Sequence, residues 1–135
     1  MCYLKIFLDY WPTDTSEFAK KINALPKIVF SKTLDKIESK STNVRLVKDN
    51  IVEEIEKMKQ QSGKNIVMYG GAGIVSLFTH LGLIDEYHLL VVPIVLGSGI
   101  PLFKNIRERI NLKFLKVRTF NSGVVGLYYR KGNEE

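Results

Sequence analysis

The sequence predicts an α/β fold in which a mixed, mostly parallel sheet is flanked by helices and followed by a C-terminal antiparallel hairpin. Strand-like and helix-like segments alternate from residue 27 to residue 96, which is typical of parallel strands joined by helices. The run 87–96 is almost continuously apolar, as expected of a central strand covered on both faces. Two later strand-like runs, 112–120 and 124–130, flank Asn121-Ser122-Gly123, which is a hairpin signal.

Two helices are predicted before the first strand. Residues 1–10 carry apolar side chains at helical spacing and end at Trp11-Pro12, because proline disfavours helix in the residue before it. Asp14 and Glu17 have the spacing of a capping box, so a second helix is expected to begin there and to stop at Pro26.

The middle of the chain is expected to supply two short strands and a helix. Residues 27–30 predict a strand whose polar continuation, Ser31-Lys32-Thr33, leaves the sheet and turns. Residues 43–47 alternate in polarity and predict a second short strand. A helix then opens at Asn50, and Gly63 is expected to end it in a left-handed conformation.

A further strand, helix and strand are predicted next. Residues 66–69 are continuously apolar and predict a buried strand. An amphipathic helix closed by Gly82 follows the next glycines, and its apolar stripe is Ile74, Leu77, Phe78 and Leu81. Pro93 lies near the end of the strand expected over 87–96 and limits hydrogen bonding there.

The composition is that of one globular domain spanning residues 1–135. The chain has 135 residues, of which 45% are hydrophobic and 25% are charged. No window has the apolar length of a membrane helix and the first residues lack the plan of a signal peptide, so a cytoplasmic protein is expected. Cys2 is the single cysteine, which excludes an intramolecular disulfide and a cysteine-based metal cluster. Redox chemistry in this chain therefore requires a borrowed cofactor.

The net charge of +6 is a mild excess of 20 basic over 14 acidic residues. The lysines are scattered among acidic residues and are not interleaved with aromatic residues, so nucleic acid binding is not expected. A phosphorylated small molecule accounts for the excess equally well.

The sharpest local feature is Tyr69-Gly70-Gly71-Ala72-Gly73, between a predicted strand and a predicted helix that begins with Ile74. Glycines let a ligand approach the backbone, and the free amides at a helix N-terminus attract phosphate, so a pyrophosphate would fit. The alternative is a tight turn that only needs flexible residues. The spacing is neither Gly-x-Gly-x-x-Gly nor a P-loop.

Two other loops follow predicted strands. Leu96-Gly97-Ser98-Gly99-Ile100-Pro101 would converge with the first glycine loop on one cleft if the two strands are parallel neighbours. A simple chain reversal is the alternative for this loop. Ser31-Lys32-Thr33 offers two hydroxyls and a cation to an anion, although such a turn is more often only solvated.

Neither histidine predicts a metal site or a catalytic triad. His80 and His88 lack an acidic or cysteine partner at ligand spacing, so structural roles are expected for both and no metal is predicted. The pair Asp85-Glu86 fits a solvated turn or cap. The catalytic residues are not identified by the sequence.

Residues 65–104, NIVMYGGAGIVSLFTHLGLIDEYHLLVVPIVLGSGIPLFK, resemble the bacterial bifunctional deaminase-reductase C-terminal domain family. This riboflavin-reductase-like family has the dihydrofolate-reductase-like fold. Trp11-Pro12, Phe30-Ser31-Lys32-Thr33-Leu34 and Ser122-Gly123-Val124-Val125 extend the resemblance over almost the whole chain.

The resemblance implies an NADPH-dependent oxidoreductase that transfers hydride to a pteridine or pyrimidine-like heterocycle, and a homodimer. The implied enzyme is similar either to the aminouracil ribosyl-phosphate reductases or to dihydrofolate reductase. The resemblance places Ser31, Lys32 and Thr33 beside the adenosine 2′-phosphate. It places the pyrophosphate at a cofactor-binding loop of Tyr69, Gly70, Gly71, Ala72, Gly73 and Ile74. The substrate-side loop contains Pro93, Leu96, Gly97 and Gly99, and an unusual Gly70-Gly71 backbone, such as a cis peptide, is expected.

The chain departs from the family pattern in two places. The family begins with a strand and a Ser-Leu-Asp-Gly-like loop, then a Gly-Arg-x-Thr helix start, so the resemblance implies that this domain is N-terminally incomplete. Riboflavin-pathway reductases also carry an acidic residue where this chain has Tyr69. The alternative function is a non-catalytic nucleotide-binding or dimerisation module with a degenerate active site.

Overall fold

The computed structural model describes residues 3–132, and the chain divides into two compact units, Met1–Gly71 and Ala72–Glu135. The division falls inside the predicted glycine loop. Each unit has its own sheet, so the two are described separately. Met1 and Cys2, which the sequence places in the first helix, lie outside the described residues.

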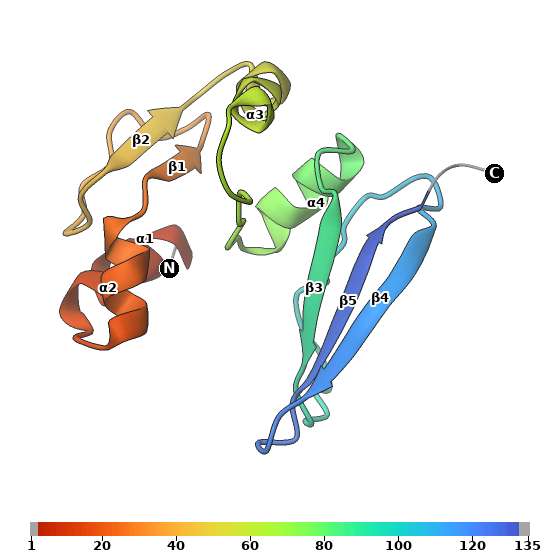
Figure 1. The fold of residues 1–135 in the computed structure, drawn as a ribbon. Helices are drawn as coiled ribbons and strands as arrows, with labels where there is room; N and C mark the ends of the chain where they lie inside the picture. The colour runs from red at the N-terminus through yellow and green to blue at the C-terminus, as the bar shows by residue number, and fades with distance from the viewer. Residues whose placement is uncertain (1–2, 133–135) are drawn as a thin grey trace. The chain divides into compact units, whose positions relative to one another are not determined.

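In the first unit, a helical N-terminal part precedes a parallel pair of strands (Figure 1). Its elements are α1 (Tyr3–Tyr10), η1 (Trp11–Thr13), α2 (Glu17–Ala24), β1 (Lys27–Phe30), β2 (Val44–Val47) and α3 (Ile51–Gln60). Strands β1 and β2 are parallel, with Lys27 opposite Val44 and Phe30 opposite Val47, which confirms both predicted strands. The buried apolar side chains of this unit are Leu8, Ala19, Ile22, Val29, Val47 and Ile55.

Trp11 is the centre of an aromatic cluster that joins α1 to α2. Its ring centroid lies 5.8 Å from that of Phe7, 5.2 Å from Tyr10 and 5.4 Å from Phe18, all edge to face. Phe7 also stacks on Tyr69, with centroids 5.7 Å apart. Edge-to-face and offset stacked pairs are favourable arrangements for aromatic rings. The cluster therefore ties both helices to the last residues of the unit.

The start of α2 differs from the prediction. Its N-cap is Ser16, whose Oγ accepts a hydrogen bond from the Ala19 amide at 3.1 Å. Asp14 instead accepts a hydrogen bond from the Ser16 amide at 2.7 Å. Asp14 is therefore not the capping residue, because its carboxylate stabilises the turn that leads into the cap.

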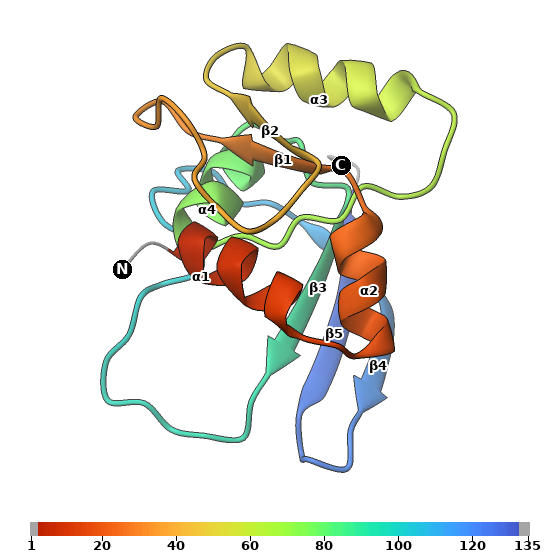
Figure 2. The same ribbon diagram turned by 90° about the vertical axis from the view of Figure 1, so that its left-hand side faces the viewer.

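The second unit consists of one helix and an antiparallel sheet (Figures 1 and 2). Its elements are α4 (Ala72–His80), β3 (Glu86–Val91), β4 (Leu112–Thr119) and β5 (Val125–Lys131). The strand order is β3-β5-β4, so β5 is the central strand. The predicted hairpin of β4 and β5 is confirmed, and Gly123 provides the positive φ of 81° that its turn requires.

The two faces of this sheet differ. Tyr87 lies on the face that α4 covers: it is buried, and its hydroxyl donates a hydrogen bond to Thr79 Oγ1 of α4 at 3.4 Å. Side chains alternate along a strand, so the cross-strand neighbours of Tyr128 lie on the other face. These neighbours are His88 on β3 and Lys116 on β4. We call this second face the Tyr128 face.

The ends of two helices test the glycine predictions. Helix α3 ends at Gln60 and is capped by Gln61 with a φ of −72°, so Gly63 is not its left-handed end. The cap at Gln61 is extended, which leaves no position there that requires glycine. Gly82, in contrast, has a φ of 68° just beyond α4, as predicted.

Two apolar runs differ from the prediction. Residues 66–69 pair with no described strand, and Ile66 and Val67 are 53% and 64% exposed. An extended run becomes a strand only where a neighbour completes its hydrogen bonds, and β1 and β2 pair with each other. Strand β3 ends at Val91 rather than at residue 96, and it is an edge strand, not a central one, because β5 is its partner among the described residues. Pro93, which has no amide hydrogen, follows its end.

The predicted α/β class with a C-terminal hairpin is confirmed, but the described strands are not mostly parallel. The parallel part is small, because two strands are parallel and three are antiparallel. Among residues 3–132, no helix is long and apolar enough to span a membrane.

Candidate functional site

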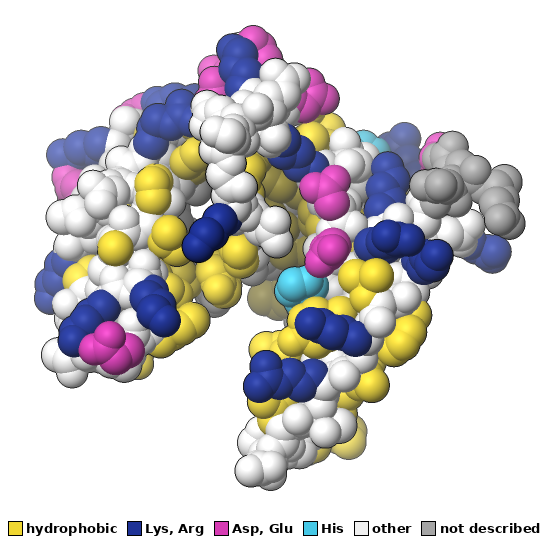
Figure 3. All heavy atoms as spheres, viewed as in Figure 1, with side chains coloured by type: hydrophobic (Ala, Val, Ile, Leu, Met, Phe, Trp, Pro, Cys, Tyr) yellow, Lys and Arg dark blue, Asp and Glu magenta, His cyan; other side chains and the backbone are white. Residues whose placement is uncertain are grey.

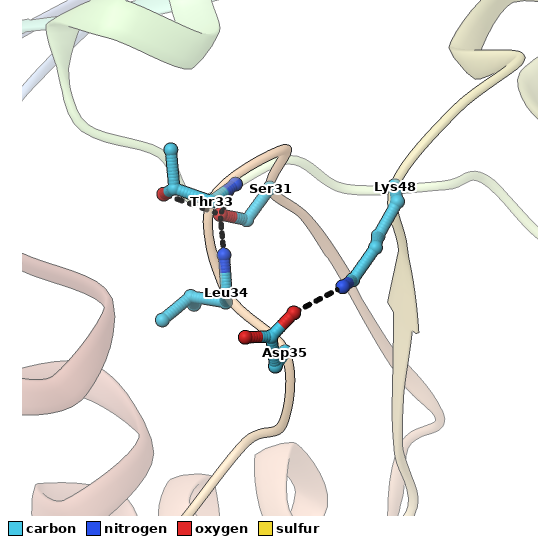
Figure 4. A network of polar contacts seen from close by, with 5 residues as sticks. All are labelled: Ser31, Thr33, Leu34, Asp35 and Lys48. Carbon is cyan, nitrogen blue, oxygen red and sulfur yellow. Dashed lines mark hydrogen bonds and ion pairs between the residues drawn. The ribbon is translucent and has the colours of Figure 1, made fainter.

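The turn after β1 is organised by the Ser31 side chain (Figure 4). The Ser31 amide donates to the Val47 carbonyl oxygen at 3.1 Å, which extends the pairing of β1 with β2 by one residue. Its Oγ accepts hydrogen bonds from the amides of Thr33 at 3.4 Å and Leu34 at 3.2 Å. A serine hydroxyl that accepts hydrogen bonds from the backbone amides two and three residues later stabilises a local turn of the chain. The predicted departure from the sheet is confirmed for Lys32 and Thr33, whereas the Ser31 amide still pairs with β2.

Two charged residues that the sequence analysis missed lie at the same edge. Lys48, directly after β2, donates to Asp35 Oδ1 at 2.6 Å (Figure 4). Lys32 is exposed and takes part in none of the described ion pairs. The carboxyl ends of parallel strands are a common place for ligands, and among the described ion pairs none gives Lys32 a carboxylate partner. The signal for Lys48 was its position immediately after a predicted strand.

The glycine loop, residues 69–74, connects the two units. Tyr69 is turned towards α1, where it stacks on Phe7. Helix α4 begins at Ala72, within the loop, and an ideal Cβ built on Gly73 would meet no other atom within 4 Å. Packing therefore does not require glycine at position 73.

The expected unusual backbone at Gly70-Gly71 is not found. The described residues contain no cis peptide bond, and their glycines with positive φ are Gly82 and Gly123. The reason is local: an irregular segment runs from residue 65 to residue 71 and enters α4 directly, which needs no left-handed residue.

The N-terminus of α4 has the electrostatics of an anion site. The first turn of a helix presents free amides and the positive end of its dipole. Helix α4 has nine residues, and none of the residues in its first turn is acidic. An anion there would meet these amides without a competing carboxylate from this turn.

The substrate-side loop, residues 93–101, is exposed throughout. Pro93 lies beside the β4–β5 turn: its Cγ is 3.2 Å from the position that a Cβ on Gly123 would occupy. Leu96, Gly97 and Gly99 follow it in the loop. Nothing lies within 4 Å of an ideal Cβ on Gly97 or Gly99. The prediction that Leu96 ends a strand is wrong, since β3 stops at Val91.

Ser76 anchors the segment that follows the substrate-side loop. Its buried Oγ donates to the Leu102 carbonyl oxygen at 3.0 Å and accepts from the Lys104 amide at 2.8 Å. Between these residues, the Phe103 ring packs edge to face on Tyr87, with centroids 6.0 Å apart. Sequence reasoning missed Ser76, and its only signal was a hydroxyl in a helix that is otherwise mostly apolar.

The structure distributes the predicted site over both units. Ser31, Lys32, Thr33, Tyr69, Gly70 and Gly71 belong to the first unit, and Ala72, Gly73, Ile74, Pro93, Leu96, Gly97 and Gly99 belong to the second. In the second unit, Ser76 ties α4 to the end of the substrate-side loop. No described hydrogen bond or ion pair joins the Ser31 turn to the glycine loop.

His88 has local partners, whereas His80 is exposed. His88 Nε2 lies 3.1 Å from Glu86 Oε2, and the His88 ring packs on Tyr128 with centroids 4.7 Å apart. His80 is exposed in the last turn of α4. Within the described part of the chain, no group of three or more His, Cys, Asp or Glu residues could hold a metal ion.

Two curated relatives come from Bacillus subtilis (strain 168), and both are uncharacterised proteins. The chain is 43% identical to YyaP over 118 residues, covering 87% of the chain and 61% of YyaP. It is 39% identical to YwjB over 74 residues, covering 55% of the chain and 42% of YwjB. The chain therefore spans less than two thirds of the length of either relative.

Two solved structures are similar to this fold. The crystal structure of a Shewanella sp. PV-4 protein assigned to riboflavin biosynthesis matches with a TM-score of 0.71 and 25% identity, over 82% of this chain and 62% of that one. A pyrimidine reductase-like protein from Corynebacterium diphtheriae matches with a TM-score of 0.54 and 20% identity, over 67% and 39%. These matches confirm the dihydrofolate-reductase-like fold. The RibD C-terminal domain model matches residues 2–126, almost the whole sequence, and the chain therefore belongs to this riboflavin-pathway, reductase-like family.

Proposed function

We propose that this chain is an NADPH-dependent reductase domain that transfers hydride to a pteridine or pyrimidine-like heterocycle. The observation that carries the proposal is the start of α4, where a glycine loop leads into a helix with open space at Gly73 and no acidic residue in its first turn. This arrangement suits the pyrophosphate of a dinucleotide. Membership of the RibD C-terminal domain family supports the reaction class.

The residues present fit the phosphate groups of NADPH. Gly70, Gly71, Ala72 and Gly73 would hold the pyrophosphate through backbone amides, with Tyr69 and Ile74 at the two ends of the loop. Ser31, Lys32 and Thr33 would hold the 2′-phosphate. Lys32 supports this assignment because it is exposed and has no described ion pair, so its charge is available to a phosphate. A lysine that contacts the 2′-phosphate would favour NADPH over NADH.

The substrate-side loop would bind the heterocycle. NADPH, when bound, supplies the hydride, so the task of the chain is to hold donor and acceptor in one geometry. Pro93, Leu96, Gly97 and Gly99 would lie beside the acceptor. Ser76 would act as a positioning residue, because its two hydrogen bonds fix residues 102–104 relative to α4.

Titration of NADPH fluorescence tests the cofactor site. We expect the wild type to bind with a Kd of about 0.1–1 mM, near −5 kcal/mol. Gly71→Val should abolish binding, because a branched side chain would occupy the approach to the loop amides. Lys32→Gln should weaken NADPH but not NADH, and Lys21→Gln, an exposed lysine of α2, should change neither.

Equal affinities in the wild type and Gly71→Val, or no wild-type signal at millimolar cofactor, would contradict the proposal. Binding of NADPH without reduction of any pterin or pyrimidine acceptor would favour the alternative, a non-catalytic nucleotide-binding module. The two readings are thus separated by following NADPH oxidation in the same samples.

We also propose that the chain forms a homodimer. Apolar side chains are exposed on and after β3, among them Leu90, Val91, Ile94, Val95 and Leu96. Exposed apolar patches of this kind commonly mark association surfaces. Light scattering should give the mass of two chains, and a monomer at micromolar concentration would contradict this proposal.

A further inference from the structure

Two cations lie side by side on the Tyr128 face at one end of the antiparallel sheet, and a third follows them in the chain on the opposite face. Lys113 on β4 is directly opposite Arg130 on β5, and Lys131 is opposite Leu112. Together with Gly132, these cations line a cavity of about 400 Å³. We call Lys113, Arg130 and Lys131 the cationic end of the sheet.

The strand register at this end places two like charges, Lys113 and Arg130, directly opposite each other. Like charges directly opposite each other on neighbouring strands are destabilising. Glu86 lies opposite Arg130 on the other side, but its Oε2 lies 3.1 Å from His88 Nε2. Among the described ion pairs, none includes Lys113, Arg130 or Lys131.

The backbone holds the cationic end in place. The Lys131 amide donates to the Asp85 carbonyl oxygen at 2.9 Å, and the Gly132 amide donates to the Asn111 carbonyl oxygen at 2.8 Å. These bonds fix the last residues of β5 between the segments that precede β3 and β4. Lys113 and Arg130 are therefore brought together by the register of the sheet.

Lys131 has a structural explanation and Arg130 has Glu86 opposite it on β3, but Lys113 has no described partner of opposite charge. Lys131 Nζ is 3.4 Å from an ideal Cβ on Gly82, which places the ammonium just beyond the C-terminus of α4. A cation there is stabilised by the helix dipole. This contact does not account for Lys113 and Arg130, which repel each other.

We propose that the cationic end binds the phosphate groups of an anionic ligand, at a site separate from the glycine loop. Arginine and lysine bind phosphate through charge-assisted hydrogen bonds, and a bound phosphate would offset the repulsion between Lys113 and Arg130. The two anion sites lie at opposite ends of α4, because the glycine loop opens this helix and Gly82 follows it. A helix of nine residues is about 14 Å long.

The Tyr128 face extends the positive charge along the sheet. Lys116 Nζ lies 4.8 Å from the centroid of the Tyr128 ring, and the Arg118 guanidinium lies 4.8 Å from that of Phe120. Aromatic rings hold these cations without neutralising them. Figure 3 shows Lys and Arg side chains over the antiparallel sheet, along its length and at its upper end. The phosphate could belong to a small molecule or to a polynucleotide laid along this face, and the experiment distinguishes the two.

The test is a titration of the isotope-labelled protein with inorganic pyrophosphate, followed by amide chemical shifts in NMR spectra. We expect shifts at Lys113, Arg130 and Gly132 in the wild type. The double variant Lys113→Gln/Arg130→Gln should weaken this binding about tenfold or more, because two charge-assisted contacts are removed. The matched control Lys21→Gln/Lys64→Gln removes the same charge from exposed positions in the first unit.

Further arms separate this site from the cofactor site and identify the source of the phosphate. Binding at the cationic end should persist in Gly71→Val, which removes the proposed pyrophosphate contact of the glycine loop. A short single-stranded oligonucleotide that binds more tightly than pyrophosphate, and is weakened by Lys116→Gln/Arg118→Gln, would identify a polynucleotide. Pyrophosphate binding that this second pair leaves unchanged would identify a small ligand. The proposal is overturned if neither probe shifts these amides at millimolar concentration, or if the control pair weakens binding as much as Lys113→Gln/Arg130→Gln.

Discussion

Ser76 and Lys104 are joined by a 2.8 Å hydrogen bond from the Lys104 amide to the Ser76 hydroxyl, and the same hydroxyl donates to Leu102. One buried side chain of α4 therefore satisfies two backbone groups of a segment that has no regular secondary structure. The exposed substrate-side loop is held at both ends, by β3 before it and by this anchor after it. The described hydrogen bonds that hold residues 102–104 against α4 thus depend on a single hydroxyl.

Replacing Ser76 by alanine tests the anchor. The variant leaves the Leu102 carbonyl and the Lys104 amide without their partner, and we expect the free energy of unfolding to fall by about 1–3 kcal/mol. Urea denaturation measures this change. Amide hydrogen exchange at Lys104 should also accelerate, because its acceptor is gone.

The matched control is Ser62→Ala, at an exposed serine beyond the end of α3. It removes the same atom without breaking a described hydrogen bond, so stability should hardly change. An equal loss in both variants, or unchanged exchange at Lys104, would show that Ser76 does not anchor the segment.

Gly123→Ala should destabilise the hairpin. Gly123 has a φ of 81°, and an added Cβ would lie 3.2 Å from Pro93 Cγ. The left-handed conformation alone costs a residue with a side chain about 1–2 kcal/mol. Thermal unfolding should show a lower Tm than the wild type. The reference variant is Gly63→Ala, since Gly63 has open space around it and is not one of the glycines with positive φ. An equally low Tm in this variant would show that the left-handed conformation of Gly123 is not the cause of the loss.

The accuracy of the sequence prediction depends on how local the determining interactions are. Residues 27–30 and the β4–β5 hairpin were predicted closely, because a short apolar run and an Asn-Ser-Gly turn specify them locally. Residues 66–69 were predicted wrongly, because apolarity does not tell whether a neighbouring strand completes the ladder. The prediction that Asp14 caps α2 was wrong for a related reason, because Ser16, two positions later, is an equally good capping residue.

The candidate site divides in the same way. The glycine loop and the Ser31 turn were found because glycine and short polar residues after a strand are visible in the sequence. Ser76 was missed, because its role depends on residues 102–104, which are far away along the chain. The cationic end was missed as well, since Lys113 and Arg130 are scattered in the sequence and only the register of β4 with β5 places them opposite each other.

Asp14 should make the stability of the first unit depend on pH in the acidic range, below the usual pKa of an aspartate. The hydrogen bond from the Ser16 amide lowers the pKa of Asp14 below its usual 3.8, with a further contribution from the Ser16 side chain. A carboxyl group whose pKa is depressed by folding stabilises the folded state above its unfolded pKa, and this contribution is lost as the pH falls through its folded pKa. The wild type should therefore lose stability relative to Asp14→Asn as the pH falls below 3.8. NMR titration of the Asp14 carboxyl group measures the pKa directly, and a value at or above 3.8 would contradict the assignment.

Gly73→Ala separates the structural role of the glycine loop from its proposed role in binding. Gly73 is the second residue of α4, and an added Cβ would meet no other atom within 4 Å. Alanine favours helix over glycine by up to about 1 kcal/mol, so the variant should be slightly more stable than the wild type.

The same methyl group would occupy the open space through which a phosphate reaches the first amides of α4. We expect NADPH binding to weaken about tenfold, or about 1.4 kcal/mol, although stability rises. Urea denaturation and NADPH titration on one preparation measure the two effects, with Gly63→Ala as the variant that should leave binding unchanged. A Gly73→Ala protein that is more stable and binds NADPH as well as the wild type would show that the loop is glycine-rich for a reason other than cofactor binding.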